Sequence, residues 1–493
     1  MTPRRIERGI FVVQTPQVPI RRERSFFAMA DSRDVVQLGR EHAIDIWMAG
    51  LKAVQADTLV QQWVRVTQDR LEFGNPTELT LDLGSVRKIV VVGAGKAGAG
   101  MVAGLEKAIP EEVAQSKQLT GWVNVPKDCV HTTRWIHLHG ARPAGCNEPT
   151  PEAVYGTERI LDLVQELEPS DLCICLLSGG GSALLPAPVA GITLEAKQAV
   201  TRFLSAAGAN INELNTVRKQ LSRIKGGGLL RYCRAGWLVS LIISDVLGDP
   251  LDIIASGPTV PDTSTPQDAL EILSKYGARE AGLPKEIFRV LEKKAANRGE
   301  RVEPQSQIFN LLIGNNRTAV DAAAARAREL GYQVEADSAV EPEGPAEEVG
   351  RELARAALEM VASPGPRCRI SGGEPVVRLA PPDVRGLGGR NQQLVLAAAE
   401  FLWERMPPEV IILSAGTDGE DGPTDAAGAF VDRAVIEQAK ERGFSPSDFL
   451  SRNDAYHFFE PLGALLRTGP THTNVCDVRV VLTHPCQSPQ RVH

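Results

Sequence analysis

Residues 87–98 read RKIVVVGAGKAG, an unbroken apolar run that ends in a glycine-rich turn. A continuous run of Val and Ile is typical of a strand buried on both faces, and such strands form parallel sheets with helical crossovers. The same pattern recurs at residues 171–182, 237–249, 308–318, 367–374 and 409–422. The repetition predicts an α/β fold. Ligands of such sheets bind outside the carboxyl ends of the strands, where all six turns fall.

The polar, charged stretch at residues 293–307 lacks apolar periodicity and predicts a boundary between two lobes near residue 305. We therefore expect a first domain at 36–305, a second at 306–493, and a disordered extension at 1–35. Residues 1–28 carry six Arg against two Glu and are followed by Met29. This segment is read either as a transit peptide or, preferably, as sequence upstream of the true start codon.

Composition excludes several classes of partner. The chain has 493 residues, with 54 Lys and Arg against 61 Asp and Glu, so its net charge of −7 disfavours nucleic-acid binding. It contains no run of about 18 apolar residues that could span a membrane. The 8 cysteines are scattered, which predicts reduced thiols and a cytoplasmic location, or a mitochondrial one if the N-terminus is a transit peptide.

The first glycine turn, Gly93 to Gly98, matches the GxGxxG pattern of dinucleotide sites. A dehydrogenase needs an acidic residue at the end of the next strand, but that strand ends in Pro126 and Lys127. Lys96 instead places a cation inside a turn that already attracts anions. We expect Gly95 and Lys96 to approach an anionic ligand, although a solvated surface lysine is the alternative.

A second turn offers successive backbone N–H groups and two hydroxyls that suit phosphate or carboxylate oxygens. It comprises Ser178, Gly179, Gly180, Gly181 and Ser182. The sequence lacks both the GxSxG nucleophile elbow and the GxxxxGK[ST] phosphate loop here. A tight turn without a ligand remains the alternative.

A short cationic segment follows a helix cap at Asn215 and carries Arg218, Lys219, Arg223 and Lys225. Four cations without compensating acids repel one another, and an anionic ligand would relieve that repulsion. A solvated basic helix explains the pattern nearly as well.

Carboxylates gather in two further turns. One contains Asp245, Asp249 and Asp252, and the other contains Asp418, Glu420, Asp421 and Asp425. Oxygen ligands at the ends of buried strands suit Mg²⁺, which bridges phosphates in phosphoryl transfer. Ordinary turn chemistry is the alternative. The metal ligands expected from the sequence are Asp245, Asp249, Asp418 and Asp421.

Nine ordered motifs together resemble the class II glycerate 2-kinases, whose C-terminal part is called the MOFRL domain. They are VVGAGKAG, LLSGGGSALL, NTVRKQLSRIKGGG, ISDVLGDPLDIIASGPTVPD, IGNNRTA, SGGEP, GLGGRNQQ, LSAGTDGEDGPTDAAGA and TGPTHTNV, and the resemblance covers residues 36–482. The resemblance implies a Rossmann-like N-terminal lobe, a second α/β lobe and an active site in the cleft between them.

The same resemblance implies transfer of the ATP γ-phosphoryl group to the 2-hydroxyl of D-glycerate, with Mg²⁺. The catalytic cations of that family fall on Lys96 and Arg390. Its motifs add Asn315, Glu374 and Asn391 to the expected substrate- and phosphate-binding residues, beside the turns above, Arg218 and Lys219.

Three residues depart from the family's motifs: Leu247, His472 and Cys476. His472 replaces a glycine at a position that often needs positive φ. The alternatives are a hydroxypyruvate reductase, a kinase of a related hydroxy acid, or a noncatalytic sensor. The oligomeric state is left open between monomer and homodimer.

Overall fold

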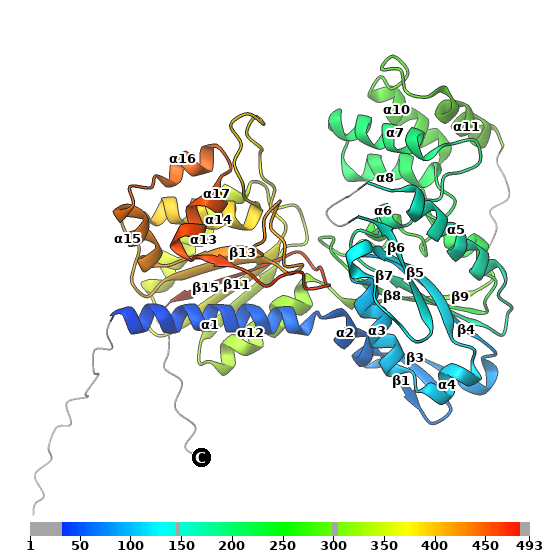
Figure 1. The fold of residues 1–493 in the computed structure, drawn as a ribbon, viewed down its shortest axis with the longest axis horizontal. Coiled ribbons are helices and arrows are strands. Elements are labelled where there is room, and N and C mark those ends of the chain that lie inside the picture. The colour runs from blue at the N-terminus through cyan, green and yellow to red at the C-terminus, as the bar shows by residue number, and fades with distance from the viewer. Residues whose placement is uncertain (1–31, 144–147, 298–303, 484–493) are drawn as a thin grey trace, which may run out of the picture.

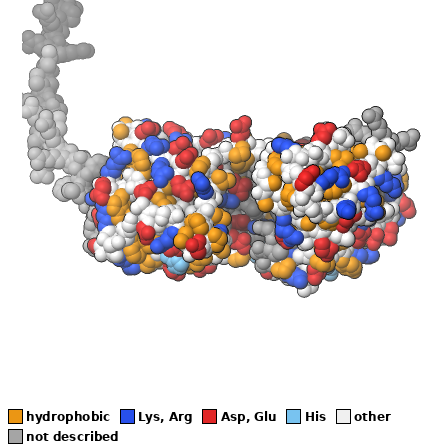
Figure 2. All heavy atoms as spheres, turned by 90° about the horizontal axis from the view of Figure 1, so that it is seen from above, with side chains coloured by type: hydrophobic (Ala, Val, Ile, Leu, Met, Phe, Trp, Pro, Cys, Tyr) orange, Lys and Arg blue, Asp and Glu red, His pale blue; other side chains and the backbone are white. Residues whose placement is uncertain are grey.

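The computed structural model describes residues 32–143, 148–297 and 304–483, with side chains from residue 36 onward. The expectations about residues 1–28 and Met29 lie outside the described residues. The chain forms two lobes that lie side by side (Figure 1). Figure 2 shows them as separate masses with a narrower region between them.

A six-stranded parallel sheet forms the centre of the first lobe. Its strand order is β6 (Ile136–Arg142), β5 (Thr120–Pro126), β4 (Ile89–Ala94), β7 (Leu172–Leu177), β8 (Trp237–Ile243) and β9 (Gln307–Gly314). Alternate residues of β4 enter different cores: Val91 packs in one and Val90 in the other. Both faces of the strand are therefore buried, as its continuous apolar run predicts.

Helices cover both faces of this sheet. α3 (Gly98–Ala108) and α2 (Ala56–Trp63) pack on one face, and α5 (Pro151–Gln165) packs on the other. α5 begins where the Thr150 hydroxyl accepts a hydrogen bond from the Ala153 N–H, with Pro151 at the first helical position. Short helices α4 (Glu111–Ser116), α6 (Gly181–Leu184) and α9 (Gly228–Tyr232) lie in the connections.

Two smaller units extend the first lobe. α7 (Leu194–Ala206), α8 (Ile211–Gln220), α10 (Pro266–Lys275) and α11 (Lys285–Ala296) share a separate apolar core at one end of the lobe (Figure 1). An antiparallel sheet of β1 (Val64–Thr67), β2 (Arg70–Gly74) and β3 (Thr77–Asp82) lies at the other end.

The second lobe contains a mixed six-stranded sheet. Its order is β10 (Gln333–Ser338), β11 (Arg367–Gly373), β15 (Asp477–Thr483), β12 (Ile411–Gly416), β13 (Gly428–Val431) and β14 (Leu465–Leu466). β10 and β11 are parallel, and the other neighbours are antiparallel.

Helices also cover both faces of the second sheet (Figure 1). α1 (Ser32–Ala53) and α12 (Asn316–Glu329) lie on one face, and α13 (Ala346–Val361) and α14 (Arg390–Leu402) lie on the other. α15 (Arg433–Glu441), α16 (Pro446–Ser451) and α17 (Ala455–Phe459) complete the lobe.

The α/β class predicted from the sequence is confirmed, and two details differ. β9 pairs with β8, so the first lobe extends to Gly314 rather than residue 305, and α1 packs on the second lobe. β12 is antiparallel to its neighbours, although its apolar run favoured a parallel strand. An apolar run shows that both faces of a strand are buried but does not encode its partner or direction.

Among the described residues, no helix is both long enough and apolar enough to cross a membrane.

Candidate active site between the lobes

The first half of the site lies at the carboxyl edge of the parallel sheet. In the strand order β6-β5-β4-β7-β8-β9, the chain adds strands on one side of β4 up to β6 and then continues on the other side from β7 to β9. The order therefore switches direction between β4 and β7. Doubly wound sheets bind their ligands at such a point, outside the carboxyl ends of the strands. The turn after β4 carries Lys96, and the turn after β7 carries Ser178 to Ser182.

The second half of the site lies at one edge of the mixed sheet. Asp477, the first residue of β15, is opposite both Gly373 and Gly416. Because β15 is antiparallel to β11 and β12, the residues that follow these two strands meet at Asp477. Glu374 and Asp418 follow those strands.

Lys96 connects the two halves. Its Nζ atom lies 3.3 Å from Oδ2 of Asp418 and 3.7 Å from Oε2 of Glu420. The Lys96 backbone N–H donates to the carbonyl of Gly179 at 2.8 Å, which holds the two glycine turns of the first lobe together. These contacts thus join the turn after β4 in the first lobe to the acidic turn after β12 in the second lobe.

The turn after β7 is tied to its neighbours by close contacts. The Ser178 hydroxyl accepts a hydrogen bond from the Ala97 N–H at 3.0 Å, and a side chain on Gly95 would collide with that hydroxyl. Gly180 has φ of 76°, a conformation that favours glycine. A Cβ on Gly179 would lie 2.1 Å from Oδ2 of Asp245, so the glycine leaves space for this carboxylate.

Asp245 follows β8 and is partly buried where the two lobes meet. Removal from water, and then the nearby charge of Glu374, raise its pKa to about 6. Its backbone carbonyl accepts a hydrogen bond from Sγ of Cys476 in the second lobe, at 3.0 Å. A carboxylate with this pKa can accept a proton near neutral pH.

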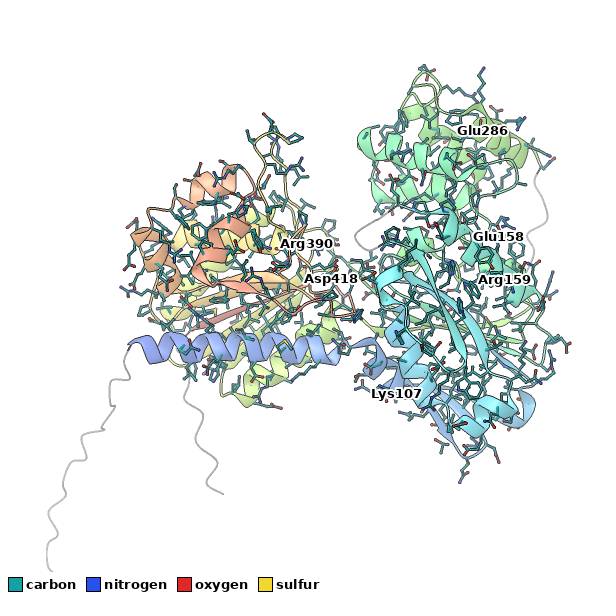
Figure 3. All side chains as sticks on the ribbon, viewed as in Figure 1. Lys107, Glu158, Arg159, Glu286, Arg390 and Asp418 are labelled. Atoms are coloured by element: carbon teal, nitrogen blue, oxygen red, sulfur yellow. The ribbon has the colours of Figure 1, made fainter. Side chains whose placement is uncertain are left out.

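Arg390 begins α14 and is held by two acids. Its Nε and Nη2 atoms donate to both oxygens of Asp477, at 2.6 and 3.0 Å, and Nη1 donates to Glu374 at 2.8 Å. Burial alone would lower the pKa of Arg390, but the bidentate Asp477 pair raises it above its usual value. Figure 3 shows Arg390 and Asp418 on the side of the second lobe that faces the first.

Asp421 and Asn391 serve the start of α14 instead of facing the lobe interface. The two oxygens of Asp421 accept hydrogen bonds from the backbone N–H groups of Asn391 and Gln392, at 3.0 and 2.8 Å. The Asn391 side chain accepts from the Ser414 hydroxyl at 2.6 Å. Both side chains are buried. The geometry assigns Asp421 to helix capping, because the Asp418–Asp425 turn folds onto α14.

Asp249 and Asn315 line a cavity of about 350 Å³ where the two lobes meet. The Asn315 amide donates to Asp249 at 2.6 Å. The cavity is bounded by both lobes, with Ser244 and Val246 on one side and residues 338–340 and Cys476 on the other. Its volume lies at the lower end of the range for small-molecule sites.

Lys219 and Arg218 are adjacent in α8 and have different surroundings. Lys219 pairs with Asp252 at 3.1 Å and Asp262 at 3.8 Å, which assigns it a structural role. No ion pair joins Arg218 to any residue that the structure describes. Within the described ranges, no group of three or more acidic, His or Cys side chains is arranged to hold a metal.

Two charged residues near the site were not expected from the sequence. Asp477, which is fully buried and grips Arg390, looked like the first residue of an apolar strand. Arg142 ends β6, and its Nη2 lies 3.1 Å from the position of a Cβ on Gly180. His472 has φ of 58°, so this turn keeps the left-handed conformation that the family's glycine favours.

Two family models match the chain. One is described as "Domain of unknown function (DUF4147)" and matches residues 42–292. The other is described as "MOFRL family" and matches residues 367–477. The gap between them contains β9, α12, β10 and α13, where the chain passes from one lobe to the other.

Individual proteins are similar over nearly the whole chain. A protein of Danio rerio named glycerate kinase is 36% identical over 90% of this chain and 97% of its own length. A Thermotoga maritima protein named D-glycerate 2-kinase is 37% identical over 88% of this chain and 98% of its own. The crystal structure of a glycerate kinase from Thermotoga maritima superposes with a TM-score of 0.75 and 34% identity, covering 92% of this chain and 100% of that chain.

Proposed function

This chain belongs to the glycerate kinase family, and we propose that it transfers the γ-phosphoryl group of ATP to the 2-hydroxyl of D-glycerate. The products are 2-phospho-D-glycerate and ADP. The observation that carries the proposal is the contact of Lys96 with Asp418 across the two lobes, close to the carboxylate of Asp245, whose pKa is raised. The similar protein of Thermotoga maritima named D-glycerate 2-kinase supports the choice of the 2-hydroxyl.

Lys96 and Arg390 supply the positive charge that phosphoryl transfer needs. The charge of the transition state is spread over the oxygens of the transferred group, and fixed cations stabilise it. Lys96 is partly exposed and can exchange its acidic partners for phosphate oxygens. Arg390 is aligned by Asp477, so its guanidinium needs little reorganisation when the charge develops.

Asp245 is the proposed general base, a role that replaces the metal-ligand role expected from the sequence. The 2-hydroxyl of the acceptor loses its proton to the Asp245 carboxylate as its oxygen bonds to the γ-phosphorus, and the bond to the leaving ADP oxygen breaks. Burial has raised the pKa of Asp245 to about 6, so the group is ionised at neutral pH yet basic enough to take the proton.

Asp418 and Glu420 fit a magnesium ion. Their oxygens flank the Lys96 ammonium at 3.3 and 3.7 Å and remain accessible, and Mg²⁺ commonly takes one or two carboxylates with water and phosphate. When bound, Mg²⁺ would neutralise charge on the nucleotide phosphates. Of the four ligands expected from the sequence, we retain Asp418, while Asp421 caps α14 and Asp249 pairs with Asn315.

The end of β5, the strand that follows β4 along the chain, disfavours the activity of a hydroxypyruvate reductase. The nicotinamide ribose would need a carboxylate at the end of β5, which ends at Pro126 and is followed by Lys127.

The test is an assay of the purified protein with ATP, Mg²⁺ and D-glycerate, with the phosphorylated position identified by NMR. We expect 2-phosphoglycerate and no oxidation of NADH or NADPH by hydroxypyruvate. Formation of 3-phosphoglycerate, or steady NADH oxidation, would overturn the proposal.

A further inference from the structure

Three cations lie close together where α7 and α8 meet the turn after β7. They are Lys197 on α7, Arg218 on α8 and Lys225 in the turn that precedes α9. Lys197 and Lys225 are only 7% and 3% exposed. Cations of this kind are rarely buried unless a partner compensates their charge.

Hydrogen bonds place Lys225 at the end of the Ser178–Ser182 turn. Its Nζ donates to the Ser182 carbonyl at 2.8 Å and to the Ser256 hydroxyl at 3.2 Å. Ser256 in turn donates to Oδ1 of Asn215 at 3.3 Å. Arg218 is three residues after Asn215 in α8, so the two share a face of the helix. That face therefore lies toward Lys225.

No carboxylate compensates this cluster among the described residues. Lys197 Nζ is buried and has no hydrogen-bond partner. Burial, then the charge of Arg218, lowers the pKa of Lys197 to about 7. Burial lowers the pKa of Lys225 well below its usual value, and Arg218 and then Lys197 lower it further.

Neighbouring cations of the same segment are paired. Lys219 forms ion pairs with Asp252 and Asp262, and Arg223 forms one with Glu158. The fold thus neutralises some cations here and leaves Lys197, Arg218 and Lys225 without acids. A buried charge without a partner destabilises a protein, so a ligand that supplies the missing negative charge is the natural explanation.

We propose that Lys197, Arg218 and Lys225 form a binding site for an oxyanion of a substrate, a carboxylate or a phosphate. The inference rests on the proposed function, because both the hydroxy acid and the nucleotide carry such a group. The site and Lys96 lie at opposite ends of one turn: Gly179 bonds to the Lys96 backbone and Ser182 bonds to Lys225. A substrate held by its anionic group at Lys225 would extend along this turn toward Lys96.

The test compares thermal unfolding of the full chain with and without D-glycerate, ADP and inorganic phosphate, each added separately. In Lys197→Met we expect the ligand-free melting temperature to rise, because an unpaired buried charge is removed. The stabilisation by at least one of the three anions should fall, with its dissociation constant raised about tenfold or more. Arg218→Gln should show the same loss of anion binding.

Arg223→Gln is the matched control, since it removes a cation that is paired with Glu158 from the same segment. It should keep the response to all three anions. Loss of the D-glycerate response alone assigns the site to the acid's carboxylate, and loss of the ADP and phosphate responses assigns it to phosphate.

The proposal is overturned if both variants respond to all three anions as the parent does, or if no anion stabilises the parent. Failure of the proposed function is seen separately, as absence of 2-phosphoglycerate from a parent protein that still binds these anions.

Discussion

The ammonium of Lys96, which follows β4 in the first lobe, lies 3.3 Å from the carboxylate of Asp418 in the second lobe. The two side chains are 30% and 18% exposed, so water weakens their attraction. Such partly exposed pairs contribute at most about 1 kcal/mol. The contact is therefore weak enough for the phosphates of the proposed substrate to replace it.

Loss of the Lys96 ammonium or of the Arg390 guanidinium should slow the chemical step. We expect Lys96→Ala and Arg390→Lys to lower kcat by about 10³-fold or more, since arginines that stabilise phosphoryl transfer are worth about 10³ to 10⁵. A lysine at 390 cannot reproduce the bidentate contact with Asp477. Steady-state kinetics measure the effect, and Arg467→Lys, at a surface pair with Asp425, is the control. A rise in KM with unchanged kcat would instead assign the residue to ground-state binding.

The variant that combines Lys96→Ala with Arg390→Lys should lose less kcat than the product of the two single losses in kcat. Lys96 and Arg390 would act on one shared anion, and residues that act on one group are not additive. Turnover of the two single variants and the double variant gives the coupling directly. Fully multiplicative losses would mean that the two cations serve separate sites.

Asp245 should determine the acid limb of the pH–rate profile. Its pKa of about 6 predicts that kcat falls as the pH drops below 6 and the carboxylate takes up a proton. Asp245→Asn should lower kcat by about 10² to 10⁴ and abolish this limb. An unchanged limb in the residual activity of the variant would exclude Asp245 as the base.

Asp245 should also destabilise the fold at neutral pH. Its folded pKa of about 6 exceeds the ordinary value of 3.8 for an aspartate, so the folded state binds the proton more tightly and stability falls as the pH rises from about 4 to 6. At pH 8, Asp245→Asn should raise the free energy of unfolding by roughly 1 to 3 kcal/mol. At pH 4 the two proteins should unfold alike in urea. A variant less stable at pH 8 would contradict this expectation.

Asp418 and Asp421 should separate by their response to magnesium. Asp418→Asn should raise the Mg²⁺ concentration needed for half-maximal rate and leave the melting temperature nearly unchanged. Asp421→Ala should lower the free energy of unfolding by about 1 to 2 kcal/mol through loss of the α14 cap. Its Mg²⁺ concentration for half-maximal rate should match that of the parent protein. If this concentration rises in Asp421→Ala and not in Asp418→Asn, Asp421 is the magnesium ligand.

The sequence alone determined the features that depend on neighbouring residues. The apolar run before Gly93 predicted the buried strand β4, and the glycines after it placed Lys96 in the turn at the carboxyl end of that strand. The Asn215 to Gly228 motif marked a cationic segment but could not tell that Lys219 is neutralised and Arg218 is not. The α/β class followed for the same local reason, because burial on both faces is written in consecutive residues.

Only the tertiary structure decided which distant residues meet. β9 joins the first sheet across a polar stretch, and α1 crosses to the second lobe, because sheet and helix partners are chosen by packing far along the chain. The same holds for Asp477, which grips Arg390 from 87 residues away. The Lys197 ammonium is likewise buried and has no hydrogen-bond partner. Its surroundings come from distant parts of the chain, so no local sequence pattern encodes them.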